Sequence, residues 1–471
     1  MSDTSTSITP TIVVPSPLAW DLGLLLATEL RKRGYDPLIR CSPEVALLVA
    51  SYNFRPTEGP ERTRRMKVAE ELQKRLVFLF FSKRFSNQWS NKWRQVSRPG
   101  RLNRLSNLYL PLPRSTWPFA QRVIRWVSGT LAGSSGVKLA IIISPLWRSV
   151  EILHPRTRVI SVVDSWDHAV KFPYGCWSDH VISWNQDLCD QWAARQGSGR
   201  THVGYPHKVA YADGAEIPST TVGDDVSRAV KTLMYAMSLG EGEDGFEEEL
   251  ELVSLIETLS ATKGISLTIK PHPLKTHNPE KISSVATQST VLATSAPPVV
   301  SNPFTPTDYS LTADYNRQRL TELQTIDAVI AWGTTFVLDT AVAEVPTIQL
   351  DLRHAHWWTL ITKFAHNDHL SELLYSRGDG AIPISSPEDL ARIFETLQTG
   401  GLERATRFSQ DLKEWLIGDR TQEGALREFG DLVDQIVKDL QQPRRRWMPW
   451  KKSVTPSGSG LPVEDSQPNV S

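Results

Sequence analysis

The sequence predicts an α/β protein in which two doubly wound parallel-sheet domains face each other across a cleft. Short apolar runs alternate with segments of helical spacing over 11–206, and the same alternation returns over 230–400. The polar stretch 207–229 between them has no clear periodicity, which indicates a linker. The chain has 471 residues, enough for two to three domains. Because ligands of such sheets bind beyond the carboxyl ends of the strands, the cleft is the expected site.

The first domain, 11–206, is expected to alternate short apolar strands with helices. The run within 138–144 is continuously apolar, as strands of a buried parallel sheet are. Gly34 ends the first helix. Strands are predicted at 11–15, 36–40, 138–144, 158–163, 180–184 and 201–205, and helices at 22–33 and 186–196.

The second domain, 230–400, repeats this pattern, and helices over 401–441 close the chain. A Ser/Thr/Pro-rich loop is predicted at 280–315. The ends, 1–10 and 442–471, are expected to be disordered, the latter after a basic start. Strands are predicted at 231–237, 265–270, 326–332 and 347–350, and helices at 246–262, 336–342, 386–399 and 402–440.

A net charge of zero hides an uneven distribution of charge along the chain. Residues 1–206 carry 28 Lys/Arg against 15 Asp/Glu, and the remainder carries 24 against 37. An insertion of about 72–137 belongs to the stretch Leu72–Val150, which has 14 basic residues, no acid and five tryptophans. Such a surface suits an anionic partner: a membrane leaflet, a nucleotide or a nucleic acid. The alternative is attraction between the two halves.

Composition excludes several classes of protein. Three cysteines and no Cys-x-x-Cys pair argue against a disulfide framework, a zinc ribbon or a thioredoxin-like site. The first ten residues lack the basic and apolar regions of a signal peptide, and no apolar run reaches the roughly 20 residues that span a bilayer. A cytoplasmic protein is therefore expected. The basic, aromatic segments at 77–93 and 444–452 would dock it on the inner face of an anionic membrane.

The first candidate motif is Lys-Pro-His-Pro, which directly follows the predicted strand 265–270. Two prolines present His272 rigidly at the carboxyl end of that strand. An imidazole there can donate to a phosphate oxygen, and Lys270 can add positive charge. The competing interpretation is a turn with an exposed histidine.

The second motif, Trp-Gly-Thr-Thr-Phe-Val-Leu-Asp, follows the strand 326–332. Thr334 and Thr335 stand at a predicted helix start, where free amides and hydroxyls can bind an anion. Asp339 lies one turn further along and could accept hydrogen bonds from ribose hydroxyls. Taken singly, a threonine N-cap and a solvated aspartate explain these residues. Together with the His272 loop, they predict a phosphate-plus-ribose site.

The third motif is Asp-Ser-Trp-Asp-His, at the end of the strand 158–163. Asp167 and His168 could act as a general base and the group that orients it. Asp164 and Asp167 could instead suggest a metal, but no further hard ligand stands near them in sequence, so no metal site is predicted. A capping role for these aspartates is equally compatible with the pattern.

In their order, these motifs resemble the GT-B glycosyltransferase and UDP-N-acetylglucosamine 2-epimerase superfamily, above all its branch that builds bacterial surface carbohydrates and capsules. The resemblance implies two Rossmann-like domains, with the nucleotide held by the second. Asp339 stands where the superfamily has a ribose-binding glutamate, and Thr340 where it has alanine. The matching segments are Ser165-Trp-Asp167, Trp184-Asn185, Gly204-Tyr-Pro206, His272-Pro273, Thr335–Thr340 and Pro346-Thr347.

The resemblance implies a glycosyltransferase that uses a nucleotide-sugar donor and a surface-polysaccharide or lipid-linked acceptor, without metal or other cofactor. The first domain would bind the acceptor, with Asp167 or His168 as the base. A UDP-sugar 2-epimerase or a CDP-polyol phosphotransferase of the same fold remains an alternative, although the latter's Thr-Asp-Tyr-Ser-Ser segment is absent. A non-catalytic nucleotide- or nucleic-acid-binding protein is a further alternative, but no nucleic-acid module is recognisable. The donor site is assigned to Ser238, Lys270, His272, Thr334, Thr335 and Asp339.

Overall fold

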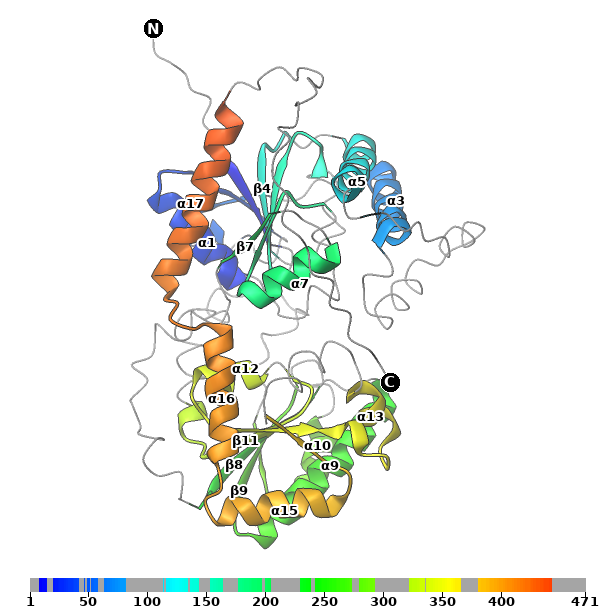
Figure 1. The fold of residues 1–471 in the computed structure, drawn as a ribbon, viewed down its shortest axis with the longest axis vertical. Coiled ribbons are helices and arrows are strands. Elements are labelled where there is room, and N and C mark those ends of the chain that lie inside the picture. Colours follow the sequence, from blue (N-terminus) through cyan, green and yellow to red (C-terminus); the bar gives the residue numbers. More distant parts are fainter. Residues whose placement is uncertain are drawn as a thin grey trace, which may run out of the picture.

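The chain forms two parallel α/β sheets, one above the other in Figure 1, each flanked by helices. Within the described residues, the first sheet has seven strands in the order β3-β2-β1-β4-β5-β6-β7, and the second has six in the order β10-β9-β8-β11-β12-β13. The computed structural model describes residues 8–14, 20–41, 46, 49–50, 52–57, 63–81, 113, 116–133, 136–143, 153–163, 177–196, 200–204, 229–238, 242–272, 279–292, 322–334, 336–365 and 380–442.

In the first sheet, alternate side chains of the central strands enter two different cores. Along β4, Leu139 and Ile141 pack with α1 and the C-terminal helix α17, whereas Ala140 and Ile142 pack with α5. This two-sided burial explains why the run is apolar at every position. The elements are β1 (Pro10–Val13), α1 (Trp20–Lys32), β2 (Leu38–Arg40), β3 (Arg55–Thr57), α3 (Arg64–Phe81), α5 (Trp117–Ala132), β4 (Leu139–Ile143), β5 (Arg158–Val162), β6 (His180–Ser183), α7 (Gln186–Gln196) and β7 (Thr201–Val203).

The second sheet is covered in the same way. One face packs on α9, α13 and α15, and the other on α12 and α16. The elements are β8 (Thr232–Ala236), α9 (Gly242–Thr262), β9 (Ser266–Lys270), α10 (Pro279–Val285), β10 (Thr290–Val291), β11 (Ala328–Ala331), α12 (Phe336–Val342), β12 (Thr347–Asp351), the 3-10 helix η8 (Leu352–His354), α13 (Thr359–Ala365), β13 (Ala381–Pro383), α15 (Pro387–Gln398), α16 (Glu403–Leu416) and α17 (Gln422–Gln441).

The last helix, α17, returns to the first sheet and completes its core, as Figure 1 shows. Phe429 and Val433 are buried beside Leu26 and Leu30 of α1. Arg33, directly after α1, stabilises this contact, because its guanidinium binds Glu29 of α1 and both Asp431 and Asp434 of α17.

Three expectations about element boundaries are wrong. The loop predicted at 280–315 contains helix α10 and strand β10. The single helix predicted at 402–440 is two helices, α16 and α17, and Gly418 between them has φ 49°, a left-handed conformation that ends a helix. The short edge strands β3 and β13, each with a proline, were not predicted.

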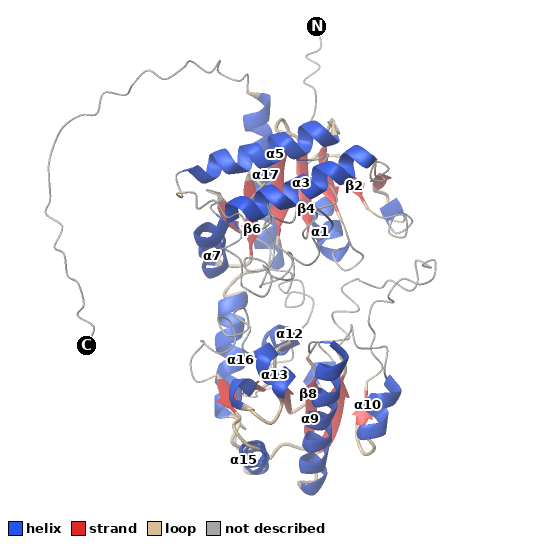
Figure 2. Cartoon of the chain, turned by 90° about the vertical axis from the view of Figure 1, so that its right-hand side faces the viewer, coloured by secondary structure: helices blue, strands red, loops and turns tan. Residues whose placement is uncertain are grey.

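The described part of the basic insertion forms two helices, α3 and α5, which lie side by side on one face of the first sheet (Figure 2). Val77 of α3 is 1% exposed and packs in the core beside Trp117 of α5, so this end of the apolar run predicted to dock on a membrane faces inward instead. None of the helices in the described part of the chain combines the length and the hydrophobicity that spanning a bilayer requires.

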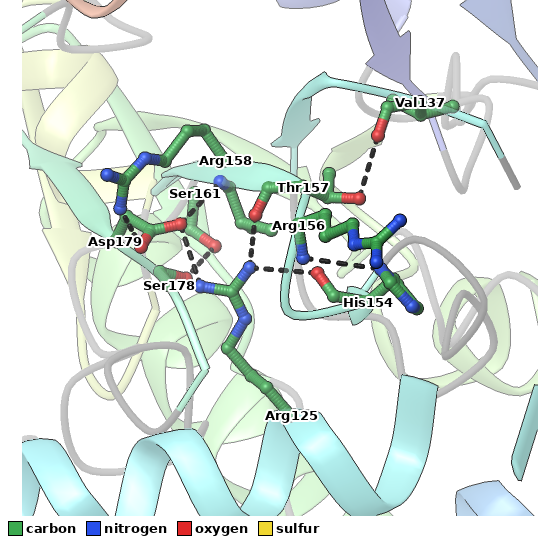
Figure 3. A network of polar contacts seen from close by, with 10 residues as sticks. Arg125, Val137, His154, Arg156, Thr157, Arg158, Ser161, Ser178 and Asp179 are labelled. Atoms are coloured by element: carbon green, nitrogen blue, oxygen red, sulfur yellow. Dashed lines mark hydrogen bonds and ion pairs between the residues drawn. The ribbon is translucent and has the colours of Figure 1, made fainter. Parts of the chain in front are cut away.

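A buried ion pair anchors α5 to the sheet (Figure 3). Arg125 donates to Asp179 over 2.8 Å and to the main-chain carbonyls of Thr157 and His154. Asp179 also accepts from Arg158 and from the amide of Val159. The partner of Arg125 therefore lies within the first half of the chain, whereas Arg33 of that half pairs with Asp431 and Asp434 of the acidic second half.

Two histidines pair across neighbouring strands of the first sheet. Nδ1 of His180 on β6 lies 2.9 Å from Nε2 of His202 on β7, so one ring donates a hydrogen bond to the other. Burial, the charge of His202 and that of Arg200 together lower the pKa of His180 to about 4, and burial lowers the pKa of His202.

We expect this pair to make the first domain sensitive to acid. Below pH 6.5 the unfolded chain takes up a proton that the folded His180 does not, so stability falls from about pH 6.5 to about pH 4. The loss is on the order of 2–3 kcal/mol. Urea unfolding at pH 7 and pH 4 should show a smaller loss in His180→Gln than in the parent. The exposed-histidine control His356→Gln should behave as the parent, and equal losses in all three would contradict the assignment.

Candidate functional site

Polar residues follow three neighbouring strands at the carboxyl edge of the second sheet. Ala236 of β8 is in register with Lys270 of β9 on one side and Ala331 of β11 on the other. The strand order reverses between β8 and β11, and ligands of doubly wound sheets bind at such a switch point. Adjacent strands are about 4.8 Å apart, so the ends of β9 and β11 lie roughly 10 Å from each other. Ser238, His272 and Thr334 each come two or three residues beyond these ends.

One side-chain contact joins the two sequence motifs. Nζ of Lys270, at the end of β9, lies 5.0 Å from the ring centroid of Phe336, the first residue of α12. An ammonium over an aromatic face is attracted by the ring quadrupole. The contact holds the ends of β9 and α12 together, and it directs a positive charge to the carboxyl edge of the sheet.

A buried hydrogen-bond chain fixes the backbone around the switch point. Trp332 donates from Nε1 to the hydroxyl of Tyr235 over 3.1 Å, and Tyr235 donates to Glu249 over 3.2 Å. The amide of Ser238 donates to the same Glu249 oxygen over 2.6 Å. All four side chains are fully buried, and burial followed by the charge of Glu249 raises the pKa of Tyr235. Because Glu249 binds the amide of Ser238, Glu249 positions the loop that follows β8.

The α12 motif is more deeply buried than the sequence suggested. The Thr334 hydroxyl accepts from the amide of Phe336 over 3.3 Å. Asp339 is 4% exposed, so the interpretation of it as a solvated residue is wrong. The hydroxyl of Thr347, on β12, donates to that of Thr340 over 2.7 Å, and Thr340 donates to the carbonyl of Val337. These two threonines satisfy each other inside the core, which accounts for a polar side chain at position 340.

The carboxyl end of β12 carries charged residues that the sequence analysis did not single out. Asp351 is bound at both oxygens by the guanidinium of Arg353, over 2.8 and 2.6 Å. Burial acts to raise the pKa of Asp351, but the hydrogen bonds and charge of Arg353 outweigh it and hold that pKa below its usual value. His354 and His356 are exposed next to this pair. In the sequence, these residues could have been found from the run Asp-Leu-Arg-His, which stands at the carboxyl end of an apolar strand.

The other predicted site residues, Asp167, His168 and Thr335, lie outside the described residues. Among the residues that are described, no group of three or more His, Cys, Asp or Glu side chains is arranged to hold a metal ion. Asp164 and Asp167 lie outside the described residues, so metal independence stays a prediction. A surface groove between α9 and α10 is lined by Glu251, Leu255 and Lys281 among others, and none of the predicted donor residues lines it.

The Trp-Asn motif joins the two domains. Trp184 and Leu188 share a buried cluster with α12 and α16. Asn185 caps α7 through the amide of Leu188 and donates to the carbonyl of Trp415, over 3.0 and 2.8 Å. Trp415 in turn donates to Asp187 over 2.9 Å. The carboxyl ends of β6 and β11 therefore face each other.

Arg420, between α16 and α17, completes this junction. It donates to the carbonyls of Trp184 and Gly204, which stand beyond the ends of β6 and β7, over 3.1 and 3.0 Å. A Cβ at position 204 would lie 1.8 Å from Cγ2 of Ile182, so only glycine fits there. Gly204 thus has a packing role beside its place in the Gly-x-Pro motif.

The amino-acid sequence matches no protein-family model and no curated protein. Comparison of structures finds similar folds. S. aureus MnaA, in a structure with UDP, is 8% identical with a TM-score of 0.50, covering 92% of this chain and 97% of that one. A protein assigned as a UDP-N-acetylglucosamine 2-epimerase from Listeria monocytogenes is 10% identical, with a TM-score of 0.49 and coverages of 93% and 98%. The calicheamicin glycosyltransferase CalG4 is 10% identical, with a TM-score of 0.46 and coverages of 92% and 99%.

The chain has a GT-B-type fold. The similarity to S. aureus MnaA and the two strand orders establish this, whereas the TM-scores of the other two structures fall below 0.5. The predicted fold class is thereby confirmed. Glycosyltransferases and UDP-N-acetylglucosamine 2-epimerases share this fold, so the fold by itself does not choose between them.

We expect Gly204→Ala to destabilise the first domain by about 1–3 kcal/mol, since the added methyl overlaps the side chain of Ile182. Ile182→Ala alone should cost about 2–5 kcal/mol through the cavity that it leaves. The double variant should cost clearly less than the sum, because removing Cγ2 makes room for the new Cβ. Urea unfolding of the four proteins measures this, and strictly additive losses would show that the overlap is not the cause.

Proposed function

We propose that the protein is a GT-B-type glycosyltransferase that moves a sugar from a nucleotide-sugar donor to a surface-polysaccharide or lipid-linked acceptor. The observation that carries the proposal is the contact of Lys270 with Phe336, which joins the loop of His272 to the helix of Asp339 at the switch point of the second sheet. An ammonium and an imidazole placed there suit the diphosphate of a nucleotide. The similarity of fold to MnaA, a protein whose structure holds UDP, supports the same ligand class.

In this proposal the second domain binds the donor through Lys270, His272, Thr334, Thr335 and Asp339, with the loop of Ser238 beside them. Cationic and hydroxyl side chains would offset the charge of the departing diphosphate, so that no metal is needed. Asp167 or His168 of the first domain would take the proton of the acceptor hydroxyl. The protein would belong to the surface-carbohydrate branch of the superfamily and act in the cytoplasm, at the inner face of the membrane.

The reaction products distinguish this proposal from its alternatives. We expect purified protein, given a panel of UDP-, CDP-, GDP- and dTDP-sugars and CDP-glycerol together with bacterial membranes as acceptor, to release a nucleoside diphosphate and to move labelled sugar into the lipid or polymer fraction. An epimerase would interconvert the sugar while it stays on the nucleotide. A CDP-polyol phosphotransferase would release the nucleoside monophosphate. Either of those outcomes would replace the proposal, and no turnover of any donor would favour a binding protein.

The donor site can be tested without turnover. Titration calorimetry with UDP and CDP should show that His272→Ala and Thr334→Ala each weaken binding about 10- to 100-fold, because a lost hydrogen bond to a charged group costs roughly 1.5–3 kcal/mol. Thr335→Ala should act in the same way. Thr399→Ala, which removes an exposed hydroxyl at the end of α15, is the matched control. Unchanged affinity in the first two variants, with native melting, would remove these residues from the site.

A further inference from the structure

The outward surface of helices α3 and α5 exposes large apolar side chains. Five such side chains stand out among the described residues, and four of them belong to these two helices. They are Phe119 at 68%, Trp126 at 62%, Val68 at 53% and Leu131 at 41%, with Trp357 of the other domain the fifth at 39%. Phe119 and Trp126 are seven residues apart, two turns along the same face of α5. A monomeric surface rarely groups such residues without a partner.

The core fixes which face of α5 points outward. Arg125 is turned inward to Asp179, and Trp117, Ile124 and Ser128 are buried on the same side. Gly129 packs so closely that a Cβ there would lie 2.5 Å from Cα of His154. The helix therefore cannot rotate to bury Trp126 without breaking this contact. Exposure of Trp126 and Phe119 is a consequence of the fold.

Basic residues surround these apolar side chains. Arg122 is exposed between Phe119 and Trp126, and Arg64, Arg65 and Lys67 are exposed around Val68. Helix α5 has no acidic residue. Each of the two glutamates of α3 forms an ion pair with a basic residue one helical turn further along: Glu70 with Lys74 and Glu71 with Arg75. The surface therefore carries a net positive charge next to its apolar side chains.

We propose that the outward surface of α3 and α5 docks the protein on a bilayer that contains anionic phospholipid. Tryptophan and phenylalanine enter the interfacial region of a bilayer, and arginine and lysine attract its negative surface potential. Helices of this composition lie on a membrane and do not span it. The sequence predicts the lipid contact at the apolar run that begins at Val77, but Val77 faces inward. The outward surface of α3 and α5 takes its place as the proposed contact.

The position of this surface leaves the candidate site free. Arg125 and Gly129 contact the residues that precede β5 and β6, so α5 crosses the amino ends of these strands. The carboxyl ends face the second domain instead. Figure 2 shows α3 and α5 across one face of the first sheet, with α5 near the end of the sheet that is further from the second domain. A membrane on α3 and α5 would thus hold the enzyme near a lipid-linked acceptor without covering the nucleotide site.

The inference deepens the proposed function by naming the surface that would bring the enzyme to its acceptor. Lipid binding is measured without any nucleotide sugar, so the two proposals can fail separately. Full-length protein is sedimented with vesicles of phosphatidylcholine alone or of equal parts phosphatidylcholine and phosphatidylglycerol. Binding should require the anionic lipid and weaken as salt is added. Absence of binding, or equal binding to both kinds of vesicle, would overturn the inference.

Matched variants locate the surface. Arg65→Gln combined with Arg122→Gln should weaken binding to anionic vesicles by about 30-fold, since each basic residue near such a leaflet contributes roughly fivefold. Phe119→Gln combined with Trp126→Gln should weaken it at least tenfold. Arg407→Gln combined with Arg427→Gln removes two exposed charges from α16 and α17 and should have little effect. If this control pair weakens binding as much as the first pair, the α3–α5 surface is not the docking site.

A local probe gives an independent readout. Cys41 and Cys189 are buried, so a cysteine introduced by Trp126→Cys, with Cys176→Ser, offers a selective site for an environment-sensitive fluorophore. Its emission should shift to the blue with anionic vesicles and stay unchanged with neutral ones. The same label introduced by Arg407→Cys should not respond. A shift at Arg407→Cys alone would assign the membrane contact to α16.

Discussion

Arg420 stands where the two domains meet, and the arrangement of the candidate site depends on it. Its guanidinium binds two carbonyls that follow β6 and β7, while the chain on either side of it belongs to α16 and α17. One side chain thereby ties the carboxyl edge of the first sheet to the segment that leaves the second sheet. A carbonyl beyond the end of a strand has no ladder partner, so the half-buried guanidinium of Arg420 satisfies two such main-chain groups and also fixes the domain junction.

The second sheet shows how buried polar groups hold loops for binding. Glu249 is fully buried, yet its carboxylate accepts hydrogen bonds from the amide of Ser238 and the hydroxyl of Tyr235. The Tyr235 hydroxyl in turn accepts from the indole of Trp332. Two neighbours in the acidic run hold the start of α13 from less buried positions: the half-buried Glu248 accepts from the amides of Leu360 and Ile361, and the exposed Glu251 accepts from the indole of Trp358. Satisfied networks of this kind are rigid, because each member would be costly to leave unpaired. The loop after β8, which the Glu249 network holds at the switch point, can therefore keep one geometry.

The sequence predicts the central strands of both sheets well because these strands are buried on both faces. The runs at β4 and β11 are apolar at every position, and the bounds of α7 and α12 agree with those expected. The prediction fails where no periodicity exists. β3 and β13 are three residues long, and the division of α16 from α17 rests on the backbone angle at Gly418. The candidate site is only partly predictable, because composition marks α9 as acidic but does not tell which glutamate turns inward.

The return of α17 to the first sheet constrains how the protein is made. A ribosome releases the strands of the first sheet early, but Phe429, Val433 and Ile436, which cover α1 and the sheet, emerge more than two hundred residues later. Until then the nascent chain exposes an apolar surface that its own second domain does not cover. Contacts of such long sequence separation close slowly. The first domain, although synthesised first, can complete its core only after the second has been translated.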